Sequence, residues 1–303
     1  TFRIISSTEI GEKTAEILPD LAACAACQHE VLDARDRRYR YPFTCCTYCG
    51  PRYSVLLDFP YDRSSTTMRQ FSMCQACQAE YDDPAQRRFH AQTNCCSACG
   101  PQLALMTADG DVRAIRDDAL LGAARAVADG SIVAVQGLGG FHLFCDAANE
   151  QAVRRLRQTK ARAAKPFAIM VRDLAHAQQL CQISPREERS LTSSGAPIVL
   201  LSRRGEAQAE VCAAVAPDLD ELGVMLAYTP MHLLLLRELA GAVVATSGNL
   251  ADEPICIEPA AARARLRGIA ELFLVHDRPI AARVDDSVVR IIAESEVVLR
   301  AGR

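Results

Sequence analysis

One pattern of cysteines occurs twice in the first hundred residues, and the second copy follows the first at an offset of fifty. Each copy holds two Cys-x-x-Cys pairs separated by eighteen residues. A Cys-x-x-Cys turn presents two thiolates to one metal ion, and two such turns complete the tetrahedral four-sulfur shell that Zn²⁺ prefers. The spacing therefore predicts two structural zinc sites. Their expected ligands are Cys24, Cys27, Cys46 and Cys49 in the first copy and Cys74, Cys77, Cys96 and Cys99 in the second.

Each copy also offers a choice of ligand, because Cys45 precedes Cys46 and Cys95 precedes Cys96. We assign Cys46 and Cys96 as ligands since they keep the two-residue spacing to the last cysteine of each copy. Cys45 and Cys95 are then expected to be packed or free neighbours of the sites. The pairs of one copy could also close a site with the pairs of the other, and the sequence leaves both arrangements open.

Glycine and histidine lie close to these cysteines. Gly50 and Gly100 directly follow the last ligand of each copy, where a residue without Cβ can take the positive φ that ends a tight turn. His29 and His90 are alternative metal ligands. They occupy non-equivalent positions in the two copies, which favours ordinary histidines over ligands.

The offset of fifty also pairs residues other than cysteine. Glu30 matches Glu80, and Arg37-Arg38 matches Arg87-Arg88. This is an internal duplication, so the two metal sites should be structurally equivalent. A disulfide framework is the alternative, but such scaffolds are short and secreted, whereas this chain has 303 residues and shows no targeting segment. Reduced, metal-binding cysteines indicate the cytoplasm.

Composition limits the partners of the chain. The net charge is -3, so no global field would attract nucleic acid or an anionic membrane. Residues 21–104 contain nine arginines, no lysine and eight acids, and this near neutrality argues against zinc fingers that bind nucleic acid. The longest apolar run, 223–239, is interrupted by polar residues, so we expect no membrane span.

The length and the change of pattern along the chain predict two main domains. We expect an N-terminal strand and linker at 1–20, a duplicated zinc module at 21–108, and an α/β domain with a twisted mixed sheet at 112–303. Helical patterns run from Asp117 to Gly130, with Asp117 and Asp118 as caps, and occupy 149–160, 173–182, 185–193, 229–240 and 258–267. Strand patterns occupy 131–135, 167–172, 197–202, 242–246, 271–275 and 286–292. A chain that starts at Thr1 and stops within a continuing segment is expected to be a piece of a longer protein.

A cluster of cations follows the second of these helices. Lys160, Arg162 and Lys165 precede Pro166, between a helix and a buried strand. Arginine offers paired donors to phosphate oxygens and lysine a compact point charge, so the cluster could hold a triphosphate. Alone, such a run is more often a solvated helix end whose cations balance the helix dipole.

Polar residues lie at the end of one expected strand, 242–246, and at the start of another, 286–292. Ser247 and Asn249 come at the end of the strand at 242–246, where α/β sheets bind ligands, although the same residues also favour a plain turn. Arg283 and Ser287 flank two aspartates, 285 and 286, which could orient a positive group or Mg²⁺ or could be an exposed pair. The glycines of 137–140 match no phosphate-binding motif. The histidines at 142, 232 and 276 are expected to be core residues.

These features together resemble one family. The two cysteine repeats, with Arg37-Arg-Tyr-Arg-Tyr-Pro-Phe43, are similar to the zinc-finger region of the HypF carbamoyltransferases of nickel-iron hydrogenase maturation. The remainder resembles their YrdC-like domain, through Gly139-Gly-Phe-His-Leu143, Lys160-x-Arg162-x-x-Lys165-Pro166, Thr246-Ser-Gly-Asn249 and Asp285-Asp-Ser-Val-Val-Arg290. The resemblance covers nearly the whole chain.

The resemblance implies a function. HypF-like enzymes use carbamoyl phosphate and ATP to carbamoylate the C-terminal cysteine of HypE, which leads to the cyanide ligands of the hydrogenase. The YrdC-like domain would form carbamoyl adenylate from ATP and carbamate. It implies Lys160 and Arg162 as catalytic residues and Lys160, Arg162, Lys165, Ser247, Asn249, Arg283 and Ser287 as nucleotide-binding residues. Zn²⁺, ATP and Mg²⁺ are the expected cofactors.

Two other functions compete with this one. Related free-standing YrdC proteins make threonylcarbamoyl adenylate for tRNA modification. This chain departs from them at two places: they have an arginine near the position of Met225 and a Pro-Thr-x-Thr loop at the position of residues 136–139. The glycine-rich loop here favours carbamate over threonine. The second alternative is a zinc-stabilised docking scaffold that is inactive alone.

Overall fold

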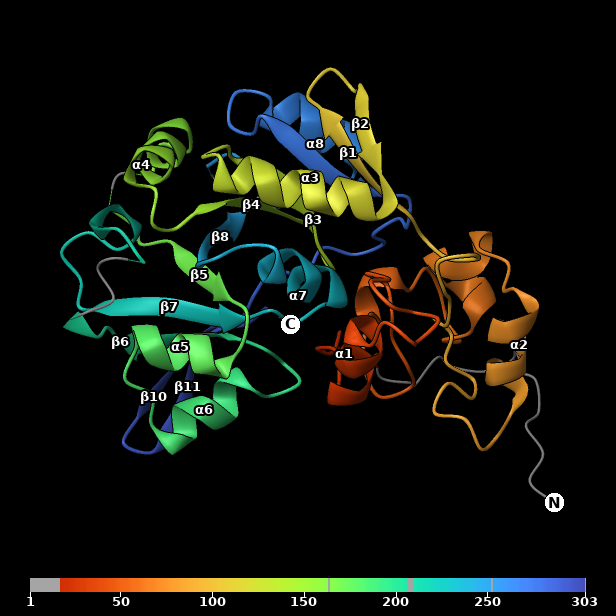
Figure 1. Ribbon diagram of the computed structural model, residues 1–303. Helices are drawn as coiled ribbons and strands as arrows, with labels where there is room; N and C mark the ends of the chain where they lie inside the picture. The colour runs from red at the N-terminus through yellow and green to blue at the C-terminus, as the bar shows by residue number, and fades with distance from the viewer. Residues whose placement is uncertain (1–16, 163, 206–209, 252, 303) are drawn as a thin grey trace.

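The computed structural model describes residues 17–162, 164–205, 210–251 and 253–302, which form a finger region beside a large α/β region (Figure 1). Residues 1–16, most of the expected N-terminal strand and linker, lie outside the described residues. Within those ranges, no helix is long and apolar enough to span a bilayer.

The finger region contains two equivalent units. Helices α1 (Ala25–Leu32) and α2 (Gln75–Asp82) each begin directly after the first cysteine of a Cys-x-x-Cys pair, so the second cysteine lies in the first turn. Short 3₁₀ turns at Tyr53–Val55, Arg63–Ser65 and Thr67–Gln70 connect the units. Arg40 and His90, fifty residues apart, both adopt a positive φ, of 55° and 53°. The duplication therefore extends to unusual backbone angles.

The two glycines that follow the last cysteines differ from each other. Gly50 has φ of 88°, as predicted for the end of a tight turn. The same prediction for Gly100 is wrong, because its φ is not in the positive region. A Cβ there would come within 2.6 Å of Cys95 Cβ and would also meet the Tyr41 hydroxyl. Close packing, rather than backbone angle, is what requires glycine at position 100.

The α/β region is built on one mixed sheet, as predicted. Eleven strands of the described chain join in the order β11-β10-β6-β7-β5-β8-β4-β3-β9-β1-β2. The pairs β10 with β6, β3 with β9 and β5 with β7 are parallel and the others are antiparallel. The strands are β1 (Leu103–Thr107), β2 (Val112–Ile115), β3 (Val133–Gln136), β4 (Phe141–Asp146), β5 (Ala168–Val171), β6 (Ile198–Ser202), β7 (Glu221–Leu226), β8 (Val243–Ser247), β9 (Leu272–His276), β10 (Val288–Ile292) and β11 (Ser295–Arg300).

Helices cover both faces of this sheet. They are α3 (Arg116–Ala128), α4 (Glu150–Thr159), α5 (Leu174–Leu180), α6 (Pro185–Leu191), α7 (Pro230–Arg237) and α8 (Pro259–Leu266), and all six match expected segments. Alternate residues of β4 enter two different apolar cores: Leu143 packs with α4, α5 and α8, and Phe144 packs with α3 and α7. The second core also contains Phe43 of the first finger, which therefore packs onto the α/β region.

Local signals set the helix ends. Asn149 accepts from the backbone N–H of Ala152 and caps α4, and Ser184 forms a capping box with Glu187 at α6. The predicted caps of α3 are wrong. Ile115 is the N-cap residue and makes no side-chain hydrogen bond. The two aspartates at 117 and 118 lie in the first turn, where their negative charge interacts favourably with the positive end of the helix dipole.

Several strands escaped the sequence prediction. β1, β2, β4, β7 and β11 were not expected. β1 pairs along its length with β9, so the sheet begins at Leu103, ahead of the expected domain boundary between 108 and 112. Short apolar runs of this kind carry little periodicity, which is why the pattern alone does not reveal them.

Candidate functional site

The eight assigned cysteines form two clusters, one in each copy of the repeat. In the first, the Sγ atoms of Cys24 and Cys46 and of Cys46 and Cys49 are 3.8 Å apart, and those of Cys27 and Cys49 are 3.5 Å apart. The second cluster has equivalent distances of 3.8, 3.8 and 3.6 Å. Tetrahedral sulfurs at the usual zinc distance are about 3.8 Å apart. The clusters therefore fit Zn²⁺, and each is closed by cysteines of one copy.

The extra cysteines lie outside the clusters, as predicted. Cys45 is buried, with its Sγ 3.1 Å from the hydroxyl of Thr93. Cys95 is also buried, and its Sγ accepts from the hydroxyl of Tyr41 at 3.5 Å. Burial raises the pKa of the Cys95 thiol to about 12, so this sulfur stays protonated.

Arginines of each finger bind the other finger. Arg37 donates to Cys77 Sγ at 3.3 Å and to Glu80 at 2.6 Å. Fifty residues later, Arg87 donates to Cys27 Sγ at 3.2 Å and pairs with Glu30 at 2.5 Å. A thiolate cluster carries net negative charge even when it holds Zn²⁺, so a cation beside it is favourable. Each finger thus supplies part of the surroundings of the other metal site.

The next arginine of each copy repeats this exchange with backbone atoms. Arg38, which is 2% exposed, donates to the carbonyl of Cys95 at 3.0 Å and to Glu80 at 2.6 Å. Arg88 donates to the carbonyl of Cys45 at 3.0 Å and pairs with Glu30. Burial opposes the charge of Glu80, but hydrogen bonds from Arg38 and Arg37 outweigh it and lower the Glu80 pKa to about 2.

In the α/β region, Lys160 lies at the C-terminal end of α4 and is almost fully buried. Its Nζ donates to the carbonyls of Ser247 at 2.6 Å and Asn249 at 2.8 Å, and to Asn249 Oδ1 at 3.1 Å. Ser247 Oγ donates to the same Oδ1 at 2.7 Å. Burial, with the nearby Arg162, lowers the Lys160 pKa to about 8. The structure therefore brings together three of the residues that the sequence singled out.

Arg162 lies beside this group. It donates to Thr246 Oγ1 at 3.1 Å, to the carbonyl of Pro166 at 2.5 Å and to that of Lys165 at 3.2 Å. Its guanidinium lies 4.8 Å from the ring centroid of Phe167. Burial lowers the Arg162 pKa to about 10. The Lys165 side chain, in contrast, is exposed on the loop.

Arg157 is a positioning residue that the sequence prediction missed. It donates to the carbonyls of Ala214 at 2.5 Å, Val215 at 2.9 Å, Arg162 at 2.8 Å and Lys165 at 3.1 Å. These bonds tie the cation-bearing loop to the segment before β7. The available signal was a cation on the buried face of α4, one residue after Leu156.

Arg283 and Ser287 have different surroundings. Arg283 is exposed and donates to the carbonyl of Ile255 at 3.0 Å, on a neighbouring loop. It lines a pocket of about 380 Å³ together with Glu253, Ile255, Cys256 and Arg265. Ser287 Oγ instead accepts from the backbone N–H of Gly302 at 3.0 Å.

The aspartates near Arg283 are engaged by protein groups. Asp286 Oδ2 lies 2.9 Å from His142 Nε2, and both side chains are buried. Asp285 pairs with Arg300 at 3.3 Å. The expectation of a plain core histidine at 142 therefore missed its carboxylate partner, and the expectation of an exposed aspartate pair is wrong for Asp286.

Glycines bring this site together. The backbone N–H of Gly248 donates to the carbonyl of Phe141 at 2.6 Å, and a Cβ at position 248 would lie 2.6 Å from Phe141 Cβ. A Cβ at Gly139 would similarly lie 2.4 Å from Val284 Cβ, and one at Gly140 would lie 2.7 Å from Ile255 Cδ1. The turn between β3 and β4 is thus packed against the loops that carry Asn249 and Arg283.

Comparisons with known proteins agree with both regions. A family profile described as Telomere recombination (Sua5, YciO and YrdC) matches residues 125–302, more than half of the chain. A second profile, described as HypF finger, matches residues 23–56 and again 73–106.

Curated relatives match over nearly the whole chain. Carbamoyltransferase HypF of Synechocystis sp. is 54% identical over 97% of this chain, and that of Rhodobacter capsulatus is 48% identical over 100% of it. The chain spans 38% and 39% of the length of these two relatives.

Solved structures give the same result. The crystal structure of full-length HypF in the phosphate- and nucleotide-bound form is 46% identical, with a TM-score of 0.89 over 95% of this chain and 37% of that one. HypF of T. kodakarensis is 40% identical, with a TM-score of 0.91 over 96% of this chain and 38% of that one. Sua5 of P. abyssi complexed with L-threonine is 21% identical, with a TM-score of 0.55 over 63% of this chain and 56% of that one, and shares the fold. The chain therefore belongs to the Sua5, YciO and YrdC family, and its paired HypF fingers and its likeness to HypF along nearly its whole length place it among the HypF-type members.

Proposed function

We propose that the α/β region forms carbamoyl adenylate from ATP and carbamate, as one step of a HypF-type carbamoyl transfer. The observation that carries this proposal is the contact of Lys160 with Ser247 and Asn249, beside Arg162. A buried lysine and a half-buried arginine converge on a polar loop at the end of a strand, which is a common place for ligand binding in α/β proteins. A phosphate there would compensate both charges.

The chemistry requires one exchange at phosphorus. A carbamate oxygen attacks the α-phosphorus of ATP, the bond from that phosphorus to the bridging oxygen breaks, and pyrophosphate leaves with the electron pair. No covalent bond to the protein is needed, so the residues act by positioning and by neutralising charge. We assign this task to Lys160 and Arg162, with Lys165 and Arg283 as further phosphate contacts.

The three protons of Lys160 already have acceptors on 247 and 249. Its role is therefore twofold: it holds the loop in shape and contributes charge from behind it. Ser247 and Asn249 then contact phosphate or ribose through groups that the loop presents. Ser287 belongs to the same assignment as a more distant contact. The pocket of about 380 Å³ beside Arg283 is large enough for part of a nucleotide.

Metal ions have two separate roles in this proposal. The two cysteine clusters would each hold a Zn²⁺ ion, which would stabilise the fingers. Mg²⁺, bound with ATP, would supply neutralisation of the phosphate charge. Since Asp286 bonds to His142 and Asp285 pairs with Arg300, the phosphates rather than these carboxylates would provide most ligands of Mg²⁺.

The partners follow from the same proposal. ATP and carbamate, the latter derived from carbamoyl phosphate, are the substrates, and a HypE-like protein with a C-terminal cysteine is the acceptor. Nucleic acid and membrane are not partners. The two clusters require reduced cysteines, which favours the cytoplasm.

Pyrophosphate exchange tests the proposal directly. Ammonium and bicarbonate in solution form carbamate, so the chain is incubated with ATP, Mg²⁺, labelled pyrophosphate and ammonium bicarbonate. Label should enter ATP, and the double variant Lys160→Ala, Arg162→Ala should abolish this exchange. Exchange that needs threonine as well would favour the tRNA-modification function. Absence of ATP or AMP binding at millimolar concentration would favour the docking scaffold.

A further inference from the structure

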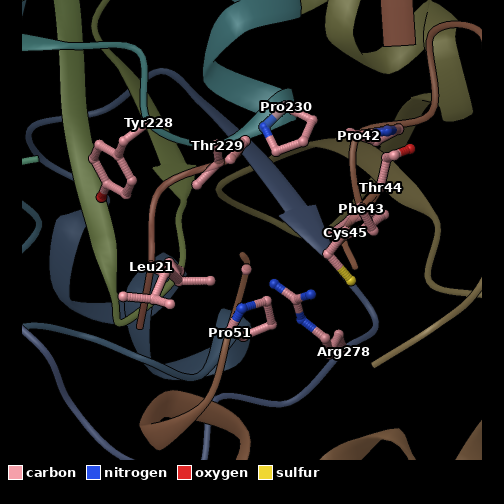
Figure 2. Close-up of a pocket in the computed structure, with 13 residues that line it drawn as sticks. Leu21, Pro42, Phe43, Thr44, Cys45, Pro51, Tyr228, Thr229, Pro230 and Arg278 are labelled. Atoms are coloured by element: carbon pink, nitrogen blue, oxygen red, sulfur yellow. The ribbon is translucent and has the colours of Figure 1, made fainter. Parts of the chain in front are cut away.

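A small cavity lies where the first finger meets the α/β region (Figure 2). Leu21, Ala23 and Phe43 belong to the finger region, and Leu138 and Arg278 come from the α/β region. The two regions are tied together around it: the backbone N–H of Ala23 donates to the carbonyl of Tyr228 at 2.8 Å. Figure 2 shows the guanidinium of Arg278 directed toward the middle of the labelled side chains.

Arg278 differs from the other buried arginines of the described chain. Arg278 is only 6% exposed. Arg38, Arg52, Arg88 and Arg157 are also buried, and each donates several hydrogen bonds to protein acceptors. The Arg278 guanidinium has no hydrogen bond or ion pair with any described residue, and it lies over the ring of Phe43, 5.1 Å from the ring centroid.

Such an arrangement favours an anionic occupant of the cavity. A buried charge is costly unless it is paired and hydrogen-bonded. Among the residues that the structure describes, no aspartate or glutamate lines this cavity or the adjoining one that shares Phe43, Leu138, Thr229 and Arg278. His276, which lines the adjoining cavity, is neutral, since burial and Arg278 lower its pKa to about 3. Arg278 thus offers five N–H donors and a positive charge for which the described part of the chain provides no counter-ion.

The size of the cavity selects the occupant. Its volume is about 30 Å³, and that of the adjoining one is about 20 Å³. On this scale a single water needs roughly 10–15 Å³, so a few atoms fit and a nucleotide does not. A guanidinium binds the two oxygens of an O–C–O group side by side. We propose that Arg278 and this cavity form a binding site for a small planar oxyanion of the carboxylate class, such as formate, bicarbonate or carbamate.

The location connects this site with the candidate nucleotide site. Leu138 lines the cavity, and the next two residues, Gly139 and Gly140, pack against Val284 and Ile255. One turn therefore separates the oxyanion cavity from the loops that carry Arg283 and the larger pocket. Carbamate as the physiological occupant rests on the proposed function; the oxyanion site itself does not.

The test uses ¹³C-formate and ¹³C-bicarbonate as probes of the whole chain, with binding followed by NMR at constant ionic strength. Arg278→Gln should weaken formate binding about tenfold or more, because a bond to a charged partner is lost. The matched control Arg113→Gln, an exposed arginine on β2, should bind as the unaltered chain does. Ala23→Val, which fills the cavity and keeps Arg278, should also abolish binding.

Retention of formate binding by Arg278→Gln would overturn the proposal. If that variant does not fold, Ala23→Val decides, and retained binding there has the same meaning. Inorganic phosphate that binds the site as tightly as formate would overturn the planar class. Lys160→Met separates the two proposals, since it should abolish pyrophosphate exchange while leaving formate binding unchanged.

Discussion

The guanidinium of Arg87 donates to the Sγ of Cys27 across 3.2 Å, although the two residues belong to different fingers. Arg37 and Cys77 make the equivalent contact in the opposite direction at 3.3 Å. Since a cation beside a thiolate cluster favours the metal-bound form, the metal affinity of each finger depends on an arginine of the other.

Arg87→Gln should therefore release zinc from the first cluster about tenfold faster, because a hydrogen bond to a charged sulfur is lost. Release to a chromogenic chelator measures this rate. Arg69→Gln, an exposed arginine between the fingers, is the control and should release zinc at the unaltered rate. Equal release by both variants would show that the cross-finger contact is unimportant for the metal.

The choice between adjacent cysteines predicts different zinc contents. Cys46→Ser should lower the zinc content from two ions to one per chain, because a four-sulfur site loses one of its ligands. Cys45→Ala should keep both ions, since its sulfur lies against Thr93 outside the cluster. Elemental analysis of the purified variants measures the content. The opposite pattern would mean that Cys45 is the ligand.

The stability of the fold should depend on pH through Lys160. Its folded pKa of about 8 lies below the ordinary value of 10.5, because burial disfavours the charged form. The folded protein therefore loses this proton before the unfolded chain does, and stability rises with pH between about 8 and 10.5. The free energy of unfolding of the unaltered chain, minus that of Lys160→Met, should increase over this range in urea titrations.

ATP binding should change in the opposite direction. Neutral Lys160 no longer attracts phosphate, so the dissociation constant for ATP should rise as the pH passes through about 8. Lys165→Met is the matched control because Lys165 is exposed and only five residues away. Its binding curve should keep the same pH dependence. A pH-independent dissociation constant in the unaltered chain would contradict the role of Lys160 charge.

Arg157 should matter for stability far more than its neighbour on α4. Arg157→Met leaves the carbonyl of Ala214 without the donor that Arg157 provides and leaves that of Val215 with only the backbone N–H of Phe167, which should cost about 2–4 kcal/mol of unfolding free energy. Arg154→Met removes an exposed pair with Glu150 and should cost less than about 0.5 kcal/mol. Urea unfolding compares the two. Similar losses for both variants would refute the positioning role of Arg157.

The cysteine sites were predictable because metal chemistry fixes their spacing. Two Cys-x-x-Cys pairs specify four ligands without any knowledge of the fold. The helices of the α/β region were predictable for a related reason, since caps such as Ser184 and Asn149 act within a few residues. The clustering of Lys160 with Ser247 and Asn249 was suggested by the family resemblance and needed the structure to give its contacts.

The remaining features depend on contacts between distant residues. The sequence marks Arg37-Arg38 and Arg87-Arg88 as repeated, but nothing local says that each pair binds the other finger. Likewise, Arg278 looks like an ordinary surface arginine until the first finger covers it. The strand β1 is apolar but short, and only its pairing with β9 places it in the sheet. Pairing partners over such separations leave no periodic signal.

The exchange of arginines between the fingers also has a consequence for biosynthesis. When a ribosome has just made the cysteines of the first finger, up to Cys49, the arginines that complete its surroundings, Arg87 and Arg88, have not yet been translated. The surroundings of the first finger are therefore completed only after about forty further residues have been translated, which takes a few seconds at usual rates of synthesis. The last ligands of the second finger, Cys96 and Cys99, follow within about ten further residues, so synthesis completes the surroundings of both fingers at nearly the same time.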